Sequence, residues 1–570
     1  MKKIVSIGKQ DFEQLRLGDY LYIDKTDFIR EWWESGDDVT LITRPRRFGK
    51  TLNMDMLKCF FSSQYAGKGK LFEGLSIWDE EKYRALQGTW PVIYLSFADV
   101  KADNYEDCRN GIAAVVNEAY QTHRYLLQSD LLTDGEKELF QVLDEYTNNP
   151  FTEKKITNEV ISRSLKILSS CMMRYYGKKV IILLDEYDTP MQEAYMYGFW
   201  DELTSFIRSL FNSTFETNPY MERAMMTGIT RVSKESIFSD LNNLNVITTT
   251  SEQYSDYFGF TQKEVSETLE VFGLGDKKEE VKLWYDGFTF GNSRDIYNPW
   301  SITNYLDKRK FSAYWASTSS NGLVNRLIRT ASPDIKEKME ELLNEKEITV
   351  SFDEQIVFEQ LERDRNAIWS LLVAAGYLKV EQVEYRGILL TPWYHLKVTN
   401  LETMSMFCNM FQGWFALSSC GYNDFIAALL NGNKKEMNVY MNDVALATFS
   451  SFDTGTHPSG KTEPERFYHG FVLGLLVDLR ERYTVKSNRE SGYGRYDVML
   501  VPLNKEDPSI VLEFKVHDPQ EETTLEETAR AALKQIEEKQ YDTELLKMGI
   551  SKERIRNYGF AFEGKKVLIM

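Results

Sequence analysis

Short apolar runs alternate with longer helical patterns along the first part of the chain. Most of these runs are apolar throughout, as in strands that are buried on both faces of a sheet. Alternation of this kind is typical of a parallel sheet covered by helices, so an α/β domain is expected over residues 1–255. The expected strands are residues 39–43, 92–97, 180–184 and 224–227.

The pattern changes near residues 260–276, where charged and helical positions indicate a domain edge. Residues 256–430 are expected to form a mostly helical middle region. Part of it, at about residues 330–400, combines helical stretches with short strand-like runs and is predicted to be winged-helix-like. The expected helices are residues 334–346 and 368–375, and the two strand-like runs are residues 385–391 and 394–399.

A third pattern begins at about residue 431 and predicts a second α/β domain that extends to residue 570. Its expected helices are residues 464–480 and 524–541, and its expected strands are residues 495–501, 510–516 and a final strand at 558–562. The chain has 570 residues, which is too long for one core and suggests about three or four domains.

Composition excludes several classes of protein. A net charge of −18 argues against a surface coated with basic patches for nucleic acid, although it allows a local basic site. The five cysteines lack C-x-x-C spacing, which argues against a disulfide framework and a zinc ribbon and favours a reducing cytoplasm. Neither a signal-peptide core nor an apolar run near 18 residues is found, so a cytoplasmic protein without a membrane span is expected.

Residues 42–51 carry the strongest functional motif. Gly49, Lys50 and Thr51 follow an expected strand and precede an expected helix, as in a loop that points backbone N–H groups at phosphate oxygens. In such a loop Lys50 would neutralise phosphate, Thr51 would bind Mg²⁺, and Arg46 and Arg47 would add cationic contacts. Arg44 occupies the position of the first glycine, and the residue before a proline favours an extended backbone, so a wider loop is expected.

Two further strands end in polar residues that could complete a nucleotide site. Asp185 and Glu186 follow an apolar strand, where Asp185 would hold Mg²⁺ and Glu186 would polarise the attacking water. Thr227 could contact the γ-phosphate from a neighbouring strand, and Arg231 could stabilise the transferring charge. The alternatives are solvated acids after a buried strand and an ordinary strand end with a surface arginine.

Two C-terminal strands bring a pair of carboxylates together. A turn centred on Lys505 would pair residues whose numbers sum to 1010, so that Asp497 faces Glu513. Facing residues have Cβ atoms about 4.5–5.5 Å apart, and two carboxylates that close repel unless a cation lies between them. Lys515 shares the face of Glu513 because side chains alternate along a strand.

These three residues predict a Mg²⁺-dependent nuclease site in which the acids bind metal and the lysine positions the nucleophile. Glu465, on the preceding expected helix, could complete the metal site, and Gln535 lies on the following one. The alternative is a solvated sheet edge, where Glu-x-Lys pairs are frequent.

Six segments together resemble the bacterial AAA-ATPase-like family, whose members commonly carry a C-terminal PD-(D/E)XK nuclease-like domain. The segments are residues 22–26, 44–51, 184–188, 227–231, 284–288 and 297–301. Residues 494–497 with 513–515 resemble the PD-(D/E)XK core, which has a restriction-endonuclease-like α/β fold. The resemblance covers essentially the whole chain and implies that an arginine at the first glycine position is a family trait.

The leading hypothesis is an ATPase that binds ATP with Mg²⁺ and hydrolyses it slowly. ATP binding would gate a metal-dependent nuclease site in the C-terminal domain, which acts on DNA or RNA. A second hypothesis is an NTP-controlled switch whose nuclease-like domain is inactive and only binds nucleic acid or a partner. A third is an NTPase with a structural C-terminal domain. The sequence leaves the substrate, the oligomeric state and activity at either site open.

Overall fold

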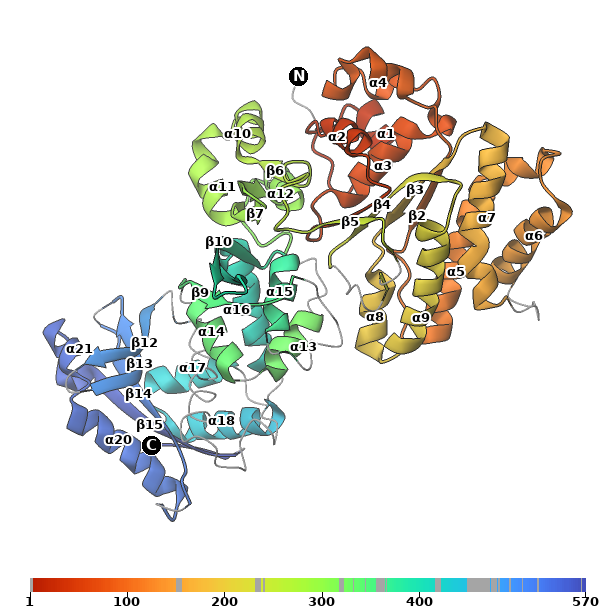
Figure 1. The fold of residues 1–570 in the computed structure, drawn as a ribbon. Coiled ribbons are helices and arrows are strands. Elements are labelled where there is room, and N and C mark those ends of the chain that lie inside the picture. Colours follow the sequence, from red (N-terminus) through yellow and green to blue (C-terminus); the bar gives the residue numbers. More distant parts are fainter. Residues whose placement is uncertain are drawn as a thin grey trace. The chain divides into compact units, whose positions relative to one another are not determined.

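The structure is a computed structural model, and its elements follow one another along the chain as coloured in Figure 1. It divides into two compact units, one formed by residues 1–323 and 349–403 and the other by residues 324–348 and 404–570. The described residues are 4–149, 156–230, 237–238, 241–316, 322–331, 333–343, 345–354, 364, 366–415, 422–448, 472, 479, 482–491, 494–504, 506–519, 522–564 and 566–570.

The first unit contains a five-stranded parallel sheet with the strand order β2-β3-β4-β1-β5. All four expected strands are confirmed: β1 (Val39–Thr43), β2 (Val92–Ser96), β3 (Val180–Asp185) and β4 (Met221–Gly228). The edge strand β5 (Leu244–Ile247) was not expected. Because β1, β3 and β4 run in the same direction, the residues that follow them meet at the carboxyl edge of the sheet.

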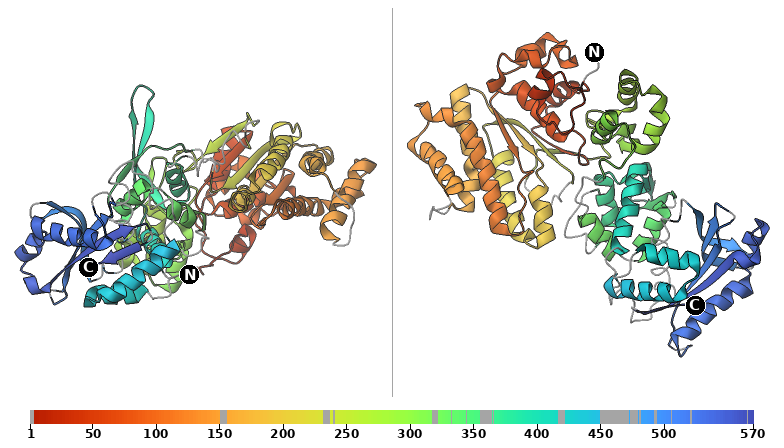
Figure 2. Two further views of the ribbon diagram at one scale, coloured as in Figure 1. Left: turned by 90° about the horizontal axis from the view of Figure 1, so that it is seen from below. Right: turned by 180° about the vertical axis from the view of Figure 1, so that it is seen from behind.

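Helices cover both faces of this sheet, as the two further views show (Figure 2). The chain moves from β1 across to β2 through α3 and then steps back through β3 to β4. Right-handed crossovers therefore put α3 on one face and α5, α7 and α9 on the other. The helices up to this point are α1 (Phe12–Leu17), α2 (Asp27–Ser35), α3 (Lys50–Phe61), α4 (Glu81–Leu86), α5 (Tyr105–Thr122), α6 (Asp134–Asn148), α7 (Asn158–Tyr176), α8 (Thr189–Tyr197) and α9 (Trp200–Phe211).

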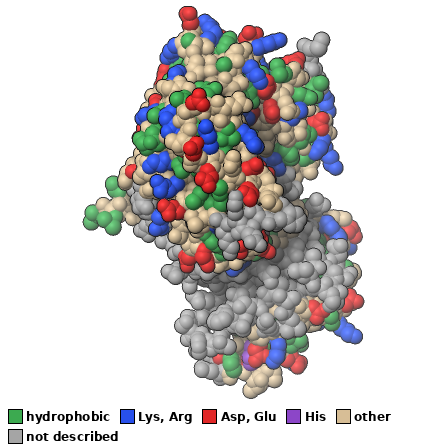
Figure 3. Space-filling model, turned by 90° about the vertical axis from the view of Figure 1, so that its right-hand side faces the viewer, with side chains coloured by type: hydrophobic (Ala, Val, Ile, Leu, Met, Phe, Trp, Pro, Cys, Tyr) green, Lys and Arg blue, Asp and Glu red, His purple; other side chains and the backbone are tan. Residues whose placement is uncertain are grey.

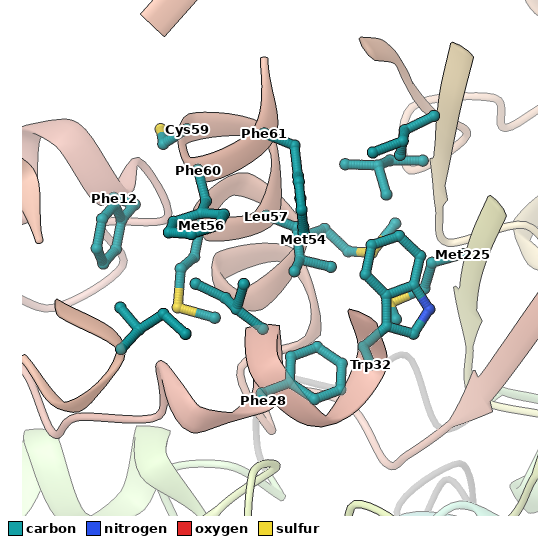
Figure 4. Packing of buried hydrophobic residues seen from close by; sticks show 14 of the residues in the cluster. Phe12, Phe28, Trp32, Met54, Met56, Leu57, Cys59, Phe60, Phe61 and Met225 are labelled. Atoms are coloured by element: carbon teal, nitrogen blue, oxygen red, sulfur yellow. The ribbon is translucent and has the colours of Figure 1, made fainter. Parts of the chain in front are cut away.

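The helix after the candidate phosphate loop, α3, is fixed by a large apolar core (Figure 4). Met54, Leu57 and Phe61 on α3 are fully buried, and Phe28 and Trp32 on α2 pack in the same cluster. Burying a side chain of this size stabilises the fold by about 1.5–3 kcal/mol. The first turn of α3 is therefore held rigidly at the edge of the sheet.

Two small sheets complete the first unit. They have the strand orders β6-β8-β7 and β10-β11-β9. The elements are β6 (Phe260–Thr261), α10 (Gln262–Val271), α11 (Lys278–Tyr285), β7 (Phe288–Phe290), β8 (Ser293–Tyr297), α12 (Pro299–Lys308), α15 (Ala367–Ala374), β10 (Leu378–Arg386) and β11 (Thr391–Val398), and β9 (Ile348–Val350) begins at the unit boundary.

The expected strand at residues 385–391 is wrong. The hairpin strands are β10 and β11, and residues 387–390 form the turn between them, with positive φ at Gly387 and Leu390. The turn carries exposed Ile388 and Leu389, which imitate a strand in the sequence pattern. The winged-helix-like arrangement at 330–400 draws on both units and stays a prediction.

The second unit is built on a mixed sheet with the order β12-β13-β14-β15-β16, in which only β14 and β15 pair in parallel. Apolar side chains cover both of its faces. The elements are α14 (Pro333–Leu343), α17 (Tyr422–Asn431), α18 (Lys434–Thr448), β12 (Tyr483–Ser491), β13 (Gly494–Pro502), β14 (Ser509–Val516), α20 (Leu525–Lys539), α21 (Thr543–Lys547), β15 (Ile555–Glu563) and β16 (Lys566–Ile569), with α13 (Gly322–Thr330) and α16 (Leu401–Phe415) beginning in the first unit.

The expected strands 495–501 and 510–516 and the helix 524–541 are confirmed as β13, β14 and α20. The expected strand at residues 558–562 is confirmed as β15, but it is not the final strand, because β16 follows it and pairs with it in an antiparallel ladder. The expected helix at 464–480 lies almost entirely outside the described residues.

Acidic and basic side chains are interspersed over the face drawn in Figure 3, without a wide field of one sign among the described side chains there. Within the described part of the chain, none of the helices combines the length and apolar composition that a membrane crossing needs.

Candidate nucleotide and nuclease sites

The candidate phosphate loop joins β1 to α3, which begins at Lys50. Its left-handed residues are Arg47, with φ +65°, and Gly49, with φ +81°. Arg44 continues the strand instead, because its backbone N–H donates to the carbonyl oxygen of Gly228 at 3.1 Å. The loop therefore turns later than it would with a glycine at position 44, as expected for a residue that precedes proline.

The side chain of Arg44 is buried completely and anchors the loop. Its Nη1 donates to the carbonyl oxygens of Thr43 at 2.9 Å and Thr248 at 2.6 Å. The guanidinium carbon lies 4.6 Å from the ring centre of Phe290, within the range of a cation–π contact. Burial lowers the pKa of this guanidinium. Arg44 thus stabilises the loop from within the fold.

Lys50 is held in place by its own loop. Its side chain is buried, and Nζ donates to the carbonyl oxygens of Arg44 and Pro45 at 3.1 Å each. Nζ also lies 3.5 Å from Oε1 of Glu186. Glu186 follows β3 with φ +52°, a conformation that non-glycine residues rarely adopt and that is common at functional sites. The predicted phosphate-binding cation and the predicted water-polarising carboxylate are therefore in contact.

Asp185 connects α3 with two strands of the sheet. Its Oδ2 accepts a hydrogen bond from Thr51 Oγ1 at 2.6 Å, and its Oδ1 accepts one from Thr227 Oγ1. Burial and then the charge of Glu186 raise the pKa of Asp185, whereas the two hydroxyl donors lower it. A hydroxyl and a carboxylate oxygen side by side are ligands that Mg²⁺ prefers.

A cavity of about 860 Å³ opens at this edge of the sheet. Seven of the predicted residues line it: Arg46, Arg47, Gly49, Lys50, Thr51, Asp185 and Glu186. Thr227 does not line the cavity, because it lies behind Asp185 and is fully buried, so contact with a γ-phosphate stays a prediction. Arg231 lies outside the described residues.

The residues present fit a nucleotide and its metal. The cavity volume falls in the range of about 300–1,000 Å³ that is usual for ligand pockets. The buried Lys50 ammonium group, at the start of α3, contacts two carbonyl oxygens of its own loop and Glu186, and it can exchange those oxygens for phosphate oxygens. Thr51 and Asp185 would then be the metal-binding pair.

The sequence did not predict that the start of α12 also lines this cavity. Trp300, at the start of α12, lies with its ring centre 4.4 Å from the guanidinium carbon of Arg47. Asn298, next to it, donates from Nδ2 to the carbonyl oxygen of Arg46 at 3.4 Å. The signal that could have found them is the segment at residues 297–301, which carries part of the family resemblance but has no predicted role.

In the second unit the predicted strand register is confirmed. Val498 pairs with Leu512, Met499 with Val511 and Leu500 with Ile510, so each pair of numbers sums to 1010. One step further, the same register brings Asp497 level with Glu513. The carboxylate of Asp497 accepts the backbone N–H of Phe514 at 2.7 Å, which ties it to β14.

Glu513 lies on the face of β14 that is covered by α20. Its side chain is buried, and Oε1 accepts a hydrogen bond from Gln535 Nε2, which also donates to the Tyr541 hydroxyl at 3.1 Å. Burial raises the pKa of Tyr541, and the charges of Glu513 and Asp497 raise it further, so both carboxylates are near this phenol. Lys515 shares the strand face of Glu513, whereas Phe514 packs in the opposite core.

The described residues give this site two carboxylates. Within the described ranges, no group of three His, Cys, Asp or Glu side chains is placed to hold a metal ion. Glu465, the predicted third ligand, lies outside the described residues. Asp497 and Glu513 still fit Mg²⁺, which is usually bound through one or two carboxylates and keeps several waters.

Comparison with known proteins finds a matching family model for each of two parts of the chain. Residues 6–238 match the family described as "Predicted AAA-ATPase", and residues 463–570 match "PD-(D/E)XK nuclease superfamily". A relative from Azotobacter chroococcum mcd 1, described as "Uncharacterized protein in vnfD 5′region", is 28% identical over 408 residues, which are 70% of this chain and 68% of the relative.

A solved structure of the Aeropyrum pernix ORC2 protein in ADPNP–ADP complexes matches with 10% identity over 68% of this chain and 92% of that chain. The TM-score is 0.24, so this likeness carries no argument, and the fold is assigned from the strand order and the family matches.

Proposed function

We propose that the chain binds ATP with Mg²⁺ and hydrolyses it slowly, since residues 6–238 match the AAA-ATPase-like family. The observation that carries this proposal is that Lys50, Thr51, Asp185 and Glu186 line one cavity at the carboxyl edge of the sheet. In parallel α/β sheets ligands bind at that edge.

Each of these residues has a distinct role in the proposed reaction. Lys50 leaves its two loop carbonyls and binds the β- and γ-phosphates, together with backbone N–H groups at the start of α3. Thr51 and Asp185 would hold Mg²⁺, which neutralises phosphate charge when bound. Glu186 accepts a proton from the attacking water.

Slow turnover is expected because Glu186 and Lys50 are paired with each other. Both must leave this contact before either can act on substrate or water. Phosphate release from ATP, measured with purified full-length protein, tests the reaction. Wild type should release phosphate, and Glu186→Gln should keep ATP affinity while turnover falls at least about 100-fold. Equal turnover in the two proteins would exclude Glu186 as the base.

We further propose that the C-terminal domain cleaves DNA or RNA with a divalent metal. Asp497 and Glu513 would bind Mg²⁺, and Lys515 would stabilise the nucleophile or the developing charge. Support comes from the confirmed register and from the hydrogen bonds that fix both carboxylates. Nicking of plasmid DNA and structured RNA with Mn²⁺ should be lost in Asp497→Ala. Equal nicking by that variant would assign the cleavage to a contaminant.

A second candidate is an NTP-controlled switch whose nuclease-like domain only binds nucleic acid or a partner. The observation that favours it is the net charge of −18, which argues against a broad basic surface for a nucleic-acid substrate. The two candidates separate on nuclease turnover with and without ATP. ATP-gated cleavage predicts that Lys50→Ala removes the ATP effect and Asp497→Ala removes cleavage, whereas the switch predicts binding without cleavage in all three proteins.

We place this activity in the cytoplasm of a bacterium. Cys59, Cys108 and Cys171 are buried thiols outside any disulfide, as expected in a reducing compartment. The relative from Azotobacter chroococcum supports a bacterial source. Cell fractionation tests the location, and light scattering with and without ATP tests whether the protein assembles.

A further inference from the structure

The phosphate loop is held by residues that lie beyond the AAA-ATPase match at residues 6–238. The ring of Phe48 meets Phe288 and Phe290 edge-on, with centroid distances of 4.7 and 5.3 Å. Gly376 packs closely against Pro45. A Cβ atom at position 376 would lie 2.8 Å from the Cγ atom of the Pro45 ring. A loop without its first glycine is thus shaped by packing against distant segments of the same unit.

Asn298 ties the start of α12 to this loop. It is completely buried, and its Oδ1 accepts hydrogen bonds from the backbone N–H groups of Trp300 at 2.9 Å and Ser301 at 3.2 Å. Its Nδ2 is directed the other way and donates to the carbonyl oxygen of Arg46. One amide therefore caps a helix with its oxygen and contacts the phosphate loop with its nitrogen.

Trp300 contacts Arg47, the loop residue that follows Arg46. The guanidinium of Arg47 lies over its indole ring, and both side chains line the nucleotide cavity. The backbone of Arg47 is left-handed, a conformation that a non-glycine residue keeps only when its surroundings impose it. The indole is such a constraint, because its contact with the guanidinium holds the Arg47 side chain in place.

We propose that Asn298 and Trp300 are positioning residues for the triphosphate of the bound nucleotide. Asn298 fixes the Arg46 carbonyl and Trp300 fixes the Arg47 side chain, so that the following N–H groups and Lys50 face the phosphates. This inference rests on the proposed nucleotide function of the loop. The recognised chemistry is the polyphosphate chain, and the base plays no part in the action of these two residues.

The test is calorimetric binding of AMP-PNP and of inorganic triphosphate, each with Mg²⁺, to full-length protein. Asn298→Asp keeps the capping oxygen and replaces the donor with a second oxygen facing the Arg46 carbonyl. It should lower Tm, because a carboxylate is buried against a carbonyl oxygen, and at a temperature where circular dichroism shows the variant folded it should raise Kd for both ligands about tenfold. Trp300→Leu should raise both Kd values by about three- to tenfold, and Trp300→Phe, which keeps a π face, should stay near wild type.

A matched control is Asp307→Asn, an exposed residue on the same helix, which should leave both Kd values unchanged. Unchanged binding by Asn298→Asp and Trp300→Leu would overturn the inference while the nucleotide function stands. If Trp300→Leu weakens AMP-PNP but not triphosphate, the indole contacts the base and the inference is also overturned. If wild type binds neither ligand, the proposed function fails and the inference fails with it.

Discussion

Thr51 Oγ1 donates a hydrogen bond to Asp185 Oδ2 at 2.6 Å, although the two residues are 134 positions apart. Thr51 is the second residue of α3, and Asp185 is the last residue of β3. Parallel strands that end at the same edge bring them together, which places a hydroxyl beside a carboxylate at one end of the nucleotide cavity. This pair is the geometric basis for the metal dependence predicted below.

Thr51→Val should remove the effect of Mg²⁺ on ATP binding. Valine keeps the shape of threonine but offers no hydroxyl to the metal, so wild type should bind ATP about tenfold more tightly with Mg²⁺ than with EDTA, and the variant about equally in both. Fluorescence titration with a labelled ATP measures the two affinities. Thr122→Val, at an exposed helix end, is the control and should behave as wild type. A full Mg²⁺ effect in Thr51→Val would exclude Thr51 as a ligand.

Gln535→Ala should impair cleavage while the domain stays folded. Gln535 holds the buried Glu513 and the Tyr541 hydroxyl, and loss of a partner that orients a metal ligand typically lowers activity about 10- to 100-fold. Initial rates of nicking with Mn²⁺ give the effect. Glu538→Gln, exposed on the same helix, should cleave at the wild-type rate. The same rate in Gln535→Ala would mean that Glu513 is not used in this geometry.

Stability of the first unit should depend on pH through Glu402. This carboxyl is completely buried and accepts hydrogen bonds from Ser301 Oγ at 2.7 Å and the Trp315 N–H at 2.5 Å. Burial raises its pKa from 4.5 to about 7, whereas the hydrogen bonds lower it. The folded state therefore holds the proton more tightly than the unfolded state, and the stabilisation is complete below pH 4.5 and lost as pH rises to about 7.

The loss across this window is about 3 kcal/mol for Glu402 alone. Glu402→Gln keeps the shape and the accepting oxygen but cannot ionise. Its Tm relative to wild type should therefore rise between pH 5 and 7, as measured by calorimetry in matched buffers. Glu138→Gln, on the exposed side of α6, should show no such trend. A Tm difference that stays constant over this range would show that Glu402 does not titrate there.

Sequence patterns predict the central strands because burial dictates their composition. Residues 39–43 and 180–185 are buried on both faces, so their apolar runs identify β1 and β3. The edge strand β5 is only half-buried over most of its length and gives no such run. At residues 387–390 exposed aliphatic side chains mimic a strand, and only the positive φ values reveal the turn.

The candidate sites also contain residues that the sequence predicts and residues that only the tertiary structure reveals. Lys50, Thr51, Asp185 and Glu186 were predictable because strand order alone brings the carboxyl ends of β1 and β3 to one edge. The contact of Asn298 with Arg46 spans 252 positions and comes from packing of a helix against the loop, which local periodicity does not encode. The burial of Arg44 was equally hidden, because a charged residue in a loop predicts exposure.

The central claim is that Lys50 binds nucleotide phosphate, and the most direct measurement compares ATP affinity in wild type and Lys50→Ala with Mg²⁺ present. Lys50→Ala should weaken binding about 10- to 100-fold, as expected for the loss of a charge-assisted hydrogen bond. Lys70→Ala, an exposed control, should bind as wild type does. Equal affinity in wild type and Lys50→Ala would contradict the assignment of residues 44–51 as a phosphate loop.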